Sequence, residues 1–453
     1  MKIFKMTFGG LGPITSATLD TSLLTVLCGK NNTGKSFCMH TFFCFLSKWR
    51  REIKQVVRED QLRVFIEKKS VDIHIGDYIG EVNAWIKASV PSFIQAIPSL
   101  LKKNSLKADG IQFDLQIDED YAREVLYNAN YKITIRISQD CEIVGAKSIG
   151  DVINIKIINK GEQFPSDDEI KDAFNQAIWY LFIHRVLPRP ILLTAERSGM
   201  VLYGDDVRNY SFSLIQAISG DSSEGDDGIL SKDPSKYAYP YAEELRGYWN
   251  YKSHGIDSVE EAGDGDPLSY SFSNLIDGKY QIKDGNIYYK QNGNDRNLLV
   301  DEVSTSIRAT TPLNYFLGAI HGINPMLMID EPELNLHPEK QRAFARFLAE
   351  LVNREHICVM MTTHSDCIIR ELNTLIALGA DKRRYGGIAA KYGYSDAELL
   401  PPDSVACGVV GGGSIKQMPV ADHGGMFIES FDETYELISA IQREIAMSEI
   451  SGS

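Results

Sequence analysis

The chain has 453 residues, of which 43% are hydrophobic and 24% charged, and its net charge is −14. These proportions are those of an ordinary globular protein, so they exclude a fibrous or wholly disordered chain. The acidic balance excludes a protein that is basic overall, but it leaves room for a local basic surface. The charge is also uneven: residues 220–266 hold twelve acidic and four basic side chains, whereas residues 48–69 hold eight basic and four acidic ones.

The first half of the chain predicts strands, then helices, then strands again. Apolar alternation and a Gly-Pro turn predict short strands over residues 2–28, and a helix follows from 36 to about 57. Residues 58–108 predict mostly helix, and residues 112–159 predict strands. A further amphipathic helix is expected over residues 167–186.

The second half contains two further strand signals and one polar segment. Residues 190–199 predict a strand that runs into a loop. Residues 279–300 predict a meander, because Asp-Gly and Asn-Gly pairs stand at its turns. The polar and acidic stretch 220–236 predicts a surface loop or a linker.

Cysteine usage and the N-terminus predict a cellular location. The seven cysteines form no CxxC pair, so we expect reduced thiols and no zinc site. The N-terminal sequence MKIFKMTFGG lacks the apolar run of a signal peptide. No apolar run approaches the roughly 20 residues that span a bilayer. We therefore expect a cytoplasmic protein that makes no membrane contact.

A glycine-rich loop is the first candidate site. It follows the buried strand LLTVLC, opens a helix and fits the pattern G-x-x-x-x-G-K-[ST], which cradles phosphate groups with backbone N–H groups. Lys35 would bridge the β- and γ-phosphates of ATP, and Ser36 would bind Mg²⁺. The expected nucleotide-binding residues of the loop are Gly29, Lys30, Asn31, Asn32, Thr33, Gly34, Lys35 and Ser36.

A second candidate is the apolar strand MLMIDE at residues 326–331, which ends in two adjacent carboxylates. Side chains alternate along a strand, so the two acids cannot perform the same task. We expect Asp330 to hold Mg²⁺, directly or through water, and Glu331 to polarise the water that attacks the phosphate.

The sequence after these acids is specific enough to indicate a family. Residues 330–341 read DEPELNLHPEKQ, and residues 357–366 read ICVMMTTHSD. They resemble the extended Walker B motif, D-loop and H-switch of ABC-type ATPases of the SMC/RecF/OLD group, of the kind found in bacterial anti-phage defence. The resemblance implies that His364 contacts or senses the γ-phosphate.

The resemblance also implies a signature motif, which in this family reaches the γ-phosphate bound by a partner subunit. The matching region here is Ser304, Thr305 and Ser306, at an expected helix start. It lacks the glycine pair and the glutamine of the usual motif. It is therefore either a divergent signature or a plain helix cap.

Two lesser candidates have two interpretations each. Residues 196–199 (ERSG) serve either the nucleotide pocket or a subunit interface, or they form a surface salt bridge. The basic stretch 47–63 (SKWRREIKQVVREDQLR) either follows a phosphate backbone or is the solvated face of a helix.

Taken together, the sequence predicts an α/β ABC-type ATPase head with a mixed sheet and an insertion. The expected division is an N-terminal lobe at 1–49, an insertion at 50–186, the ATPase core at 187–380 and a tail at 381–453. OLD-type nucleases carry a C-terminal nuclease domain with a Glu and an Asp-x-Asp pair, and no such pattern follows His364.

The expected function is a switch that dimerises around ATP and Mg²⁺ and controls a separate effector protein, a nuclease or toxin. A DNA-binding ATPase of repair or chromosome maintenance, and an ATP-bound scaffold with negligible turnover, are the alternatives. Nucleic acid is therefore a second candidate partner.

Overall fold

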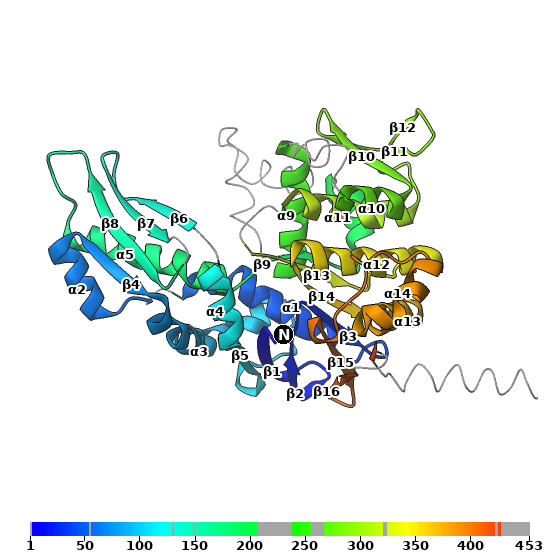
Figure 1. Ribbon diagram of the computed structural model, residues 1–453, viewed down its shortest axis with the longest axis horizontal. Helices are drawn as coiled ribbons and strands as arrows, with labels where there is room; N and C mark the ends of the chain where they lie inside the picture. The colour runs from blue at the N-terminus through cyan, green and yellow to red at the C-terminus, as the bar shows by residue number, and fades with distance from the viewer. Residues whose placement is uncertain are drawn as a thin grey trace, which may run out of the picture.

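A mixed six-stranded sheet forms the centre of the molecule in the computed structural model (Figure 1). Its order is β16-β15-β3-β14-β13-β9, in which β16 (Ser414–Met418) is antiparallel to β15 (Val405–Gly411) and the other neighbours are parallel. The expected mixed α/β fold class is therefore confirmed. The structure describes residues 2–53, 56–128, 131–147, 150–205, 238–254, 267–319, 324–421 and 425–426.

The central strands are apolar along their whole length because helices cover both faces of the sheet. In β13 (Pro325–Asp330), Met326 and Met328 face one hydrophobic core, whereas Leu327 and Ile329 face another. Helix α1 (Lys35–Ser47) lies in the first core. The second core is formed mainly by α12 (Pro338–Glu355) and α13 (Asp366–Ala380) with their neighbours.

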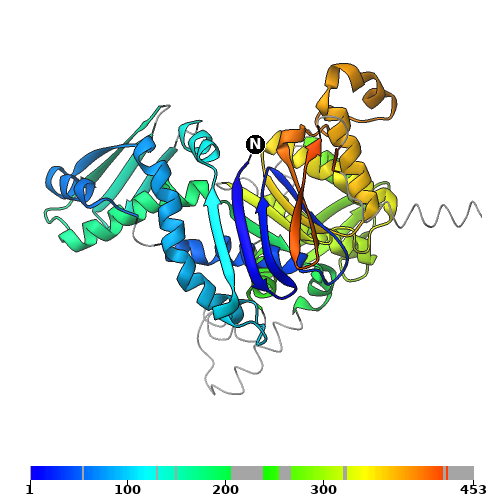
Figure 2. The same cartoon turned by 90° about the horizontal axis from the view of Figure 1, so that it is seen from below.

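A three-stranded antiparallel sheet in the order β2-β1-β5 lies beside the central sheet (Figure 2). The start of β2 contacts the turn between β15 and β16, where the N–H of Thr15 donates to the carbonyl of Gly413 at 2.8 Å. Strand β5 (Gln112–Ile117) comes from the range expected to be an insertion, yet it pairs with β1 (Phe4–Leu11). That range is therefore joined to the N-terminal strands by a sheet.

The remainder of that range forms an extension at one end of the molecule (Figures 1 and 2). Its antiparallel sheet has the order β4-β8-β7-β6, and helix α5 (Asp167–Leu181) packs on it. Helix α5 begins with a capping box, in which the Ser166 hydroxyl accepts from the N–H of Glu169 and the Glu169 carboxylate accepts from the N–H of Ser166.

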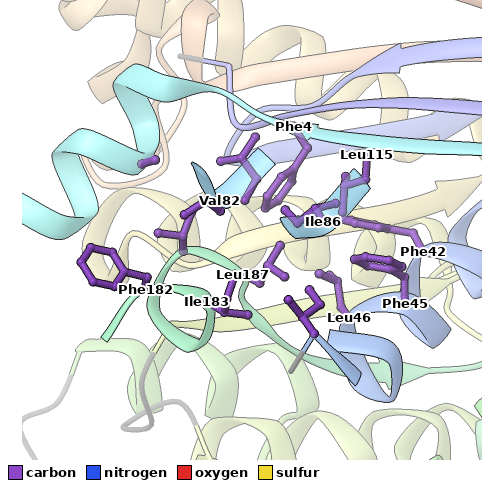
Figure 3. Packing of buried hydrophobic residues seen from close by; sticks show 14 of the residues in the cluster. Phe4, Phe42, Phe45, Leu46, Val82, Ile86, Leu115, Phe182, Ile183 and Leu187 are labelled. Carbon is purple, nitrogen blue, oxygen red and sulfur yellow. The ribbon is translucent and has the colours of Figure 1, made fainter. Parts of the chain in front are cut away.

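The extension and the N-terminal lobe share one hydrophobic core (Figure 3). Phe42 and Phe45 of α1 lie beside Ile86 of the long helix α3 (Ile75–Leu100), and Val82 of the same helix belongs to the same core. Leu187, which precedes β9, completes the contact. Helix α1 directly follows the phosphate loop, so this shared core connects the extension to the candidate site.

The remaining elements are short strands and surface helices. The meander expected over residues 279–300 is confirmed as the sheet β10-β11-β12. The other strands are β2 (Ile14–Asp20), β3 (Leu24–Cys28), β4 (Ser70–His74), β6 (Tyr131–Arg136), β7 (Cys141–Lys147), β8 (Val152–Asn159), β9 (Arg189–Leu193), β10 (Gly278–Lys283), β11 (Asn286–Gln291), β12 (Asn297–Leu299), β14 (Cys358–Thr363), β17 (Val420–Ala421) and β18 (Gly425–Met426). The other helices are η1 (Trp49–Glu52), α2 (Glu59–Lys68), η2 (Ala108–Gly110), α4 (Glu119–Asn128), α6 (Ile183–Val186), α9 (Tyr239–His254), α10 (Pro267–Ile276), α11 (Thr305–Ala319), α14 (Lys382–Lys391) and η3 (Pro402–Ser404).

Some expectations differ from the structure. The mostly helical range 58–108 contains β4, and the expected strands of 112–159 are interrupted by α4. The expected tail contributes β15 and β16 to the central sheet. The segment 220–236 lies outside the described residues. In the described part of the chain, no helix is long and apolar enough to span a bilayer.

Candidate nucleotide-phosphate site

The glycine-rich loop connects β3 to α1, as the sequence predicts. Gly29 and Gly34 have φ values of +141° and +105°, which favour glycine. A Cβ at Gly29 would lie 2.4 Å from the carbonyl oxygen of Val410, so a side chain has no room there. Helix α1 begins without an acidic residue in its first turn or a side-chain cap. Its N-terminus therefore suits a bound anion.

Lys35 lies inside the loop and is only 4% exposed. Its Nζ donates to the carbonyls of Gly29 and Lys30, both at 2.9 Å. The loop backbone thus holds the ammonium group beside the N-terminus of α1. A phosphate in this position would meet both the lysine charge and the helix dipole.

Ser36 and Asp330, the two expected Mg²⁺ ligands, lie together although 294 residues separate them. The Ser36 hydroxyl donates to Oδ1 of Asp330 at 3.0 Å. Thr362 of β14 is the register partner of Asp330 and also donates to Oδ1. A hydroxyl and a carboxylate oxygen beside a phosphate loop are the hard ligands that Mg²⁺ takes together with phosphates and water. The donor set therefore fits Mg²⁺.

The charge state of Asp330 is set by its neighbours. Burial acts to raise the pKa of this carboxyl, but the imidazole of His40 and the hydroxyls of Thr362 and Ser36 outweigh it, so the pKa lies below its usual value. Nε2 of His40 lies 3.4 Å from Oδ2. Asp330 is thus held as a carboxylate, the form that binds a metal ion.

Glu331 follows the strand in a left-handed conformation, with φ at +48°. Its N–H lies 3.2 Å from both the carbonyl and the hydroxyl oxygen of Thr362. A non-glycine residue with this φ is uncommon and costs about 1 kcal/mol or more.

His364 lies beside Glu331, as expected. Its Nδ1 is 3.6 Å from Oε1 of Glu331 and 3.1 Å from Oε1 of Glu333. Glu333 is buried, and its Oε1 also accepts from the N–H of His364 at 2.7 Å and from the hydroxyl of Thr363 at 2.9 Å. Glu333 therefore fixes the C-terminal end of β14, which His364 directly follows.

Arg197 supports the acidic turn from behind. The residue is 2% exposed, and each of its five N–H groups faces a backbone carbonyl. Since all its donors are used, this arginine is a positioning residue within the subunit, and the interface and surface-salt-bridge interpretations are not supported. The acceptors are the carbonyls of Thr194, Ala309, Asp330, Glu331 and Pro332, at 2.8–3.2 Å.

Glu244 of α9 is a buried acid that the sequence did not single out. Its Oε2 accepts from the N–H of Thr194 at 3.0 Å, and its Oε1 is buried without a partner. Burial raises the pKa of Glu244 from 4.5 to about 7, against the opposing effects of the Thr194 hydrogen bonds and of Arg197. The group therefore changes charge near neutral pH.

This shift predicts a pH-dependent stability. Because the folded-state pKa of about 7 lies above the unfolded value of 4.5, the folded protein binds the proton more tightly. The free energy of unfolding should therefore fall by about 3 kcal/mol as pH rises through this window. Glu244→Gln should remove this slope, as measured by urea denaturation at several pH values. If Glu244→Gln keeps the wild-type dependence of the free energy of unfolding on pH, the prediction is wrong. Glu162→Gln, at an exposed position, is the control.

The signature region begins helix α11, as predicted. Ser304 and Thr305 are exposed, and the hydroxyls of Ser304 and Ser306 lie 2.8 Å apart. The N–H of Ile307 lies 3.5 Å from the Ser304 hydroxyl, which is a weak cap. The helix start thus offers hydroxyls and N–H groups to a ligand or another subunit.

Several site residues escaped the sequence interpretation. Thr362 and Glu333 lie within the two motifs at residues 330–341 and 357–366, but no role was predicted for either. His40 could have been found, because it lies one helical turn after Ser36 and so shares its face. Glu244 carries no local signal, since only the packing of α9 against β9 buries it.

A family model described as AAA ATPase domain matches residues 240–369, which include both acids and His364 but not the phosphate loop. No curated protein matches the chain. Similar solved structures include an Smc head domain with an extended coiled coil, bound to the C-terminal domain of ScpA, from Pyrococcus furiosus (11% identity, 98% of this chain and 100% of that chain covered, TM-score 0.35).

Two other similar structures are the SMC head domain from Thermotoga maritima (10% identity, 93% and 100% covered, TM-score 0.32) and an SmcHead bound to the C-winged helix domain of ScpA (10% identity, 94% and 98% covered, TM-score 0.37). These TM-scores are too low to support a conclusion about this chain, so its fold class is assigned from its own central sheet.

Proposed function

We propose that the chain is an ATP-hydrolysing switch, two copies of which close around ATP and thereby control a separate effector protein. The observation that carries the proposal is the hydrogen bond between Ser36 of the phosphate loop and Asp330 of the carboxylate strand. It brings the two halves of a nucleotide site together at one point. The match of residues 240–369 to an ATPase domain supports ATP as the nucleotide.

Each residue of the site has a defined task. The loop N–H groups and Lys35 would hold the phosphates, while Ser36 and Asp330 would hold Mg²⁺, which neutralises phosphate charge when bound. Glu331 would orient the attacking water and accept its proton. His364, held by Glu333, would donate a hydrogen bond to the γ-phosphate. The protein's contribution is thus positioning and electrostatic stabilisation.

The site would be completed by a second copy. Ser304 is exposed and Ser306 half-buried at the N-terminus of α11, where they would meet the γ-phosphate bound by the partner. ATP would then hold the dimer closed until hydrolysis removes the contact. The damaging chemistry would belong to the effector, a nuclease or toxin of anti-phage defence.

The dimer is tested by Ser306→Glu. An acidic residue in the first turn of α11 favours the helix, so the fold should persist. Its charge should repel the γ-phosphate of the partner's ATP and abolish ATP-dependent dimerisation in light scattering, with ATP affinity retained. Thr374→Glu, at an exposed position of α13, is the control. Equal dimerisation of both variants would contradict the proposal.

The effector is tested by affinity capture of the chain at native expression, with and without ATP. A protein that is captured in one nucleotide state and released in the other is the expected result. Stimulation of hydrolysis by duplex DNA, with strong dependence on salt, would instead favour the DNA-binding alternative.

A further inference from the structure

A cavity of about 640 Å³ lies between η1 and α5, at the opposite end of α1 from the phosphate loop. Its volume falls in the range of small-molecule sites. The lining includes Arg50, Arg51, Asn175, Trp179, Tyr180 and His184. None of these residues belongs to the phosphate site, so an inference about the cavity does not depend on hydrolysis there.

Two arginines line the cavity, Arg50 and Arg51, and Arg185 and Arg189 lie close enough to act on His184 of its lining. In the described part of the chain, no carboxylate lies within ion-pair distance of Arg50, Arg51, Arg185 or Arg189. Asp172 is the acid on the lining, and it is exposed. Burial and these four guanidinium groups lower the pKa of His184 to about 4, so its ring is neutral at physiological pH. In a chain with net charge −14, such a cluster favours an anionic ligand.

Three buried polar atoms of the lining have no hydrogen-bond partner. They are Nε of Arg50, Oδ1 of Asn175 and Nδ1 of His184. Arg50 is only 4% exposed, and its Nη1 already donates to the carbonyls of Leu187 and Pro188. A buried polar atom left unpaired costs about 1–3 kcal/mol. A ligand with both acceptors and donors would recover that cost.

The same cavity offers aromatic rings. Trp179, Tyr180 and His184 contact one another, with ring centroids 5.1–5.6 Å apart. Trp179 is fixed because its Nε1 donates to the carbonyl of Arg50 at 3.1 Å. Trp179 and Tyr180 are half-buried, so part of each ring faces the cavity. Flat heteroaromatic groups stack on such rings.

We propose that this cavity binds a free nucleoside monophosphate. The phosphate would lie on Arg50 and Arg51, and the base would stack on Trp179, with the perpendicular ring of Tyr180 at its edge. The hydrogen-bonding edge of the base would meet Asn175 and His184. Phosphate alone would leave the rings and these two side chains unused, and one nucleotide fills a cavity of this size better than a strand does.

Tryptophan fluorescence tests the proposal in the full-length Lys35→Ala protein, in which the phosphate loop is impaired. AMP, UMP, inorganic phosphate and decathymidylate are titrated separately. A monophosphate is expected to quench the fluorescence, and Trp179→Phe to remove the quenching while calorimetry still detects binding. Arg51→Ala, at an exposed position, should weaken binding about tenfold or more, as the loss of one charge-assisted hydrogen bond implies.

The control variant is Arg63→Ala, which removes an exposed arginine from α2 outside the cavity and should bind as before. Equal affinity of the Arg51→Ala and Arg63→Ala proteins would overturn the proposal. So would inorganic phosphate that binds as tightly as the monophosphates, since the site would then hold only a generic anion. Much tighter binding of decathymidylate would assign the cavity to a nucleic-acid strand instead.

Discussion

Replacement of Glu331 by glutamine is expected to reduce ATP turnover by about 10²- to 10⁴-fold, the usual contribution of a general base. The amide keeps the shape of the side chain but cannot accept the proton of the attacking water. ATP binding should persist, because Lys35 and the N-terminus of α1 are unchanged. The protein should therefore accumulate as an ATP-bound dimer.

Phosphate release and light scattering with ATP measure the two effects. The matched control is Glu339→Gln, which changes an exposed acid in the first turn of α12 and should leave turnover intact. If wild type and Glu331→Gln share the same near-zero rate, the protein is an ATP-bound scaffold and not an enzyme.

Arg197→Ala is expected to lower the free energy of unfolding by about 3 kcal/mol or more, because each buried acceptor left unpaired costs about 1–3 kcal/mol. The change removes a donor from five carbonyls, of which those of Thr194 and Glu331 keep a backbone N–H as a second donor. It also opens a cavity beneath the acidic turn. Turnover should fall as well, because the left-handed turn at Glu331 loses its support.

Urea denaturation of the variants measures the loss. Arg197→Lys keeps the charge but supplies three donors, so its stability should be intermediate. Arg296→Ala removes an exposed arginine and should change the free energy of unfolding by about 0.5 kcal/mol or less. Equal losses for Arg197→Ala and Arg296→Ala would contradict the positioning role.

The sequence predicted the parts of the site that have a local pattern. The glycine spacing indicated the phosphate loop, and the apolar strand ending in two acids indicated the pair of Asp330 and Glu331. The approach of Asp330 to Ser36 was expected because both residues were predicted to hold Mg²⁺. These features depend on residue type and short spacing, which a single sequence displays.

The supporting residues could not be predicted in the same way. Arg197 is a positioning residue only because its five acceptors come from three separate segments of the chain. The role of β15 in the central sheet depends on a pairing with β3 across about 380 residues. Neither arrangement leaves a periodic signal, since each is decided by tertiary packing.

The strand order of the central sheet has a consequence for synthesis. The phosphate-loop strand β3 lies between β14 and β15, which are translated more than 300 residues later. An N-terminal fragment on the ribosome therefore exposes both edges of an apolar strand and must wait for its neighbours. Such non-local pairing slows folding. Competence to bind nucleotide should thus arise only after β15 has been translated, so shorter products would not compete for ATP.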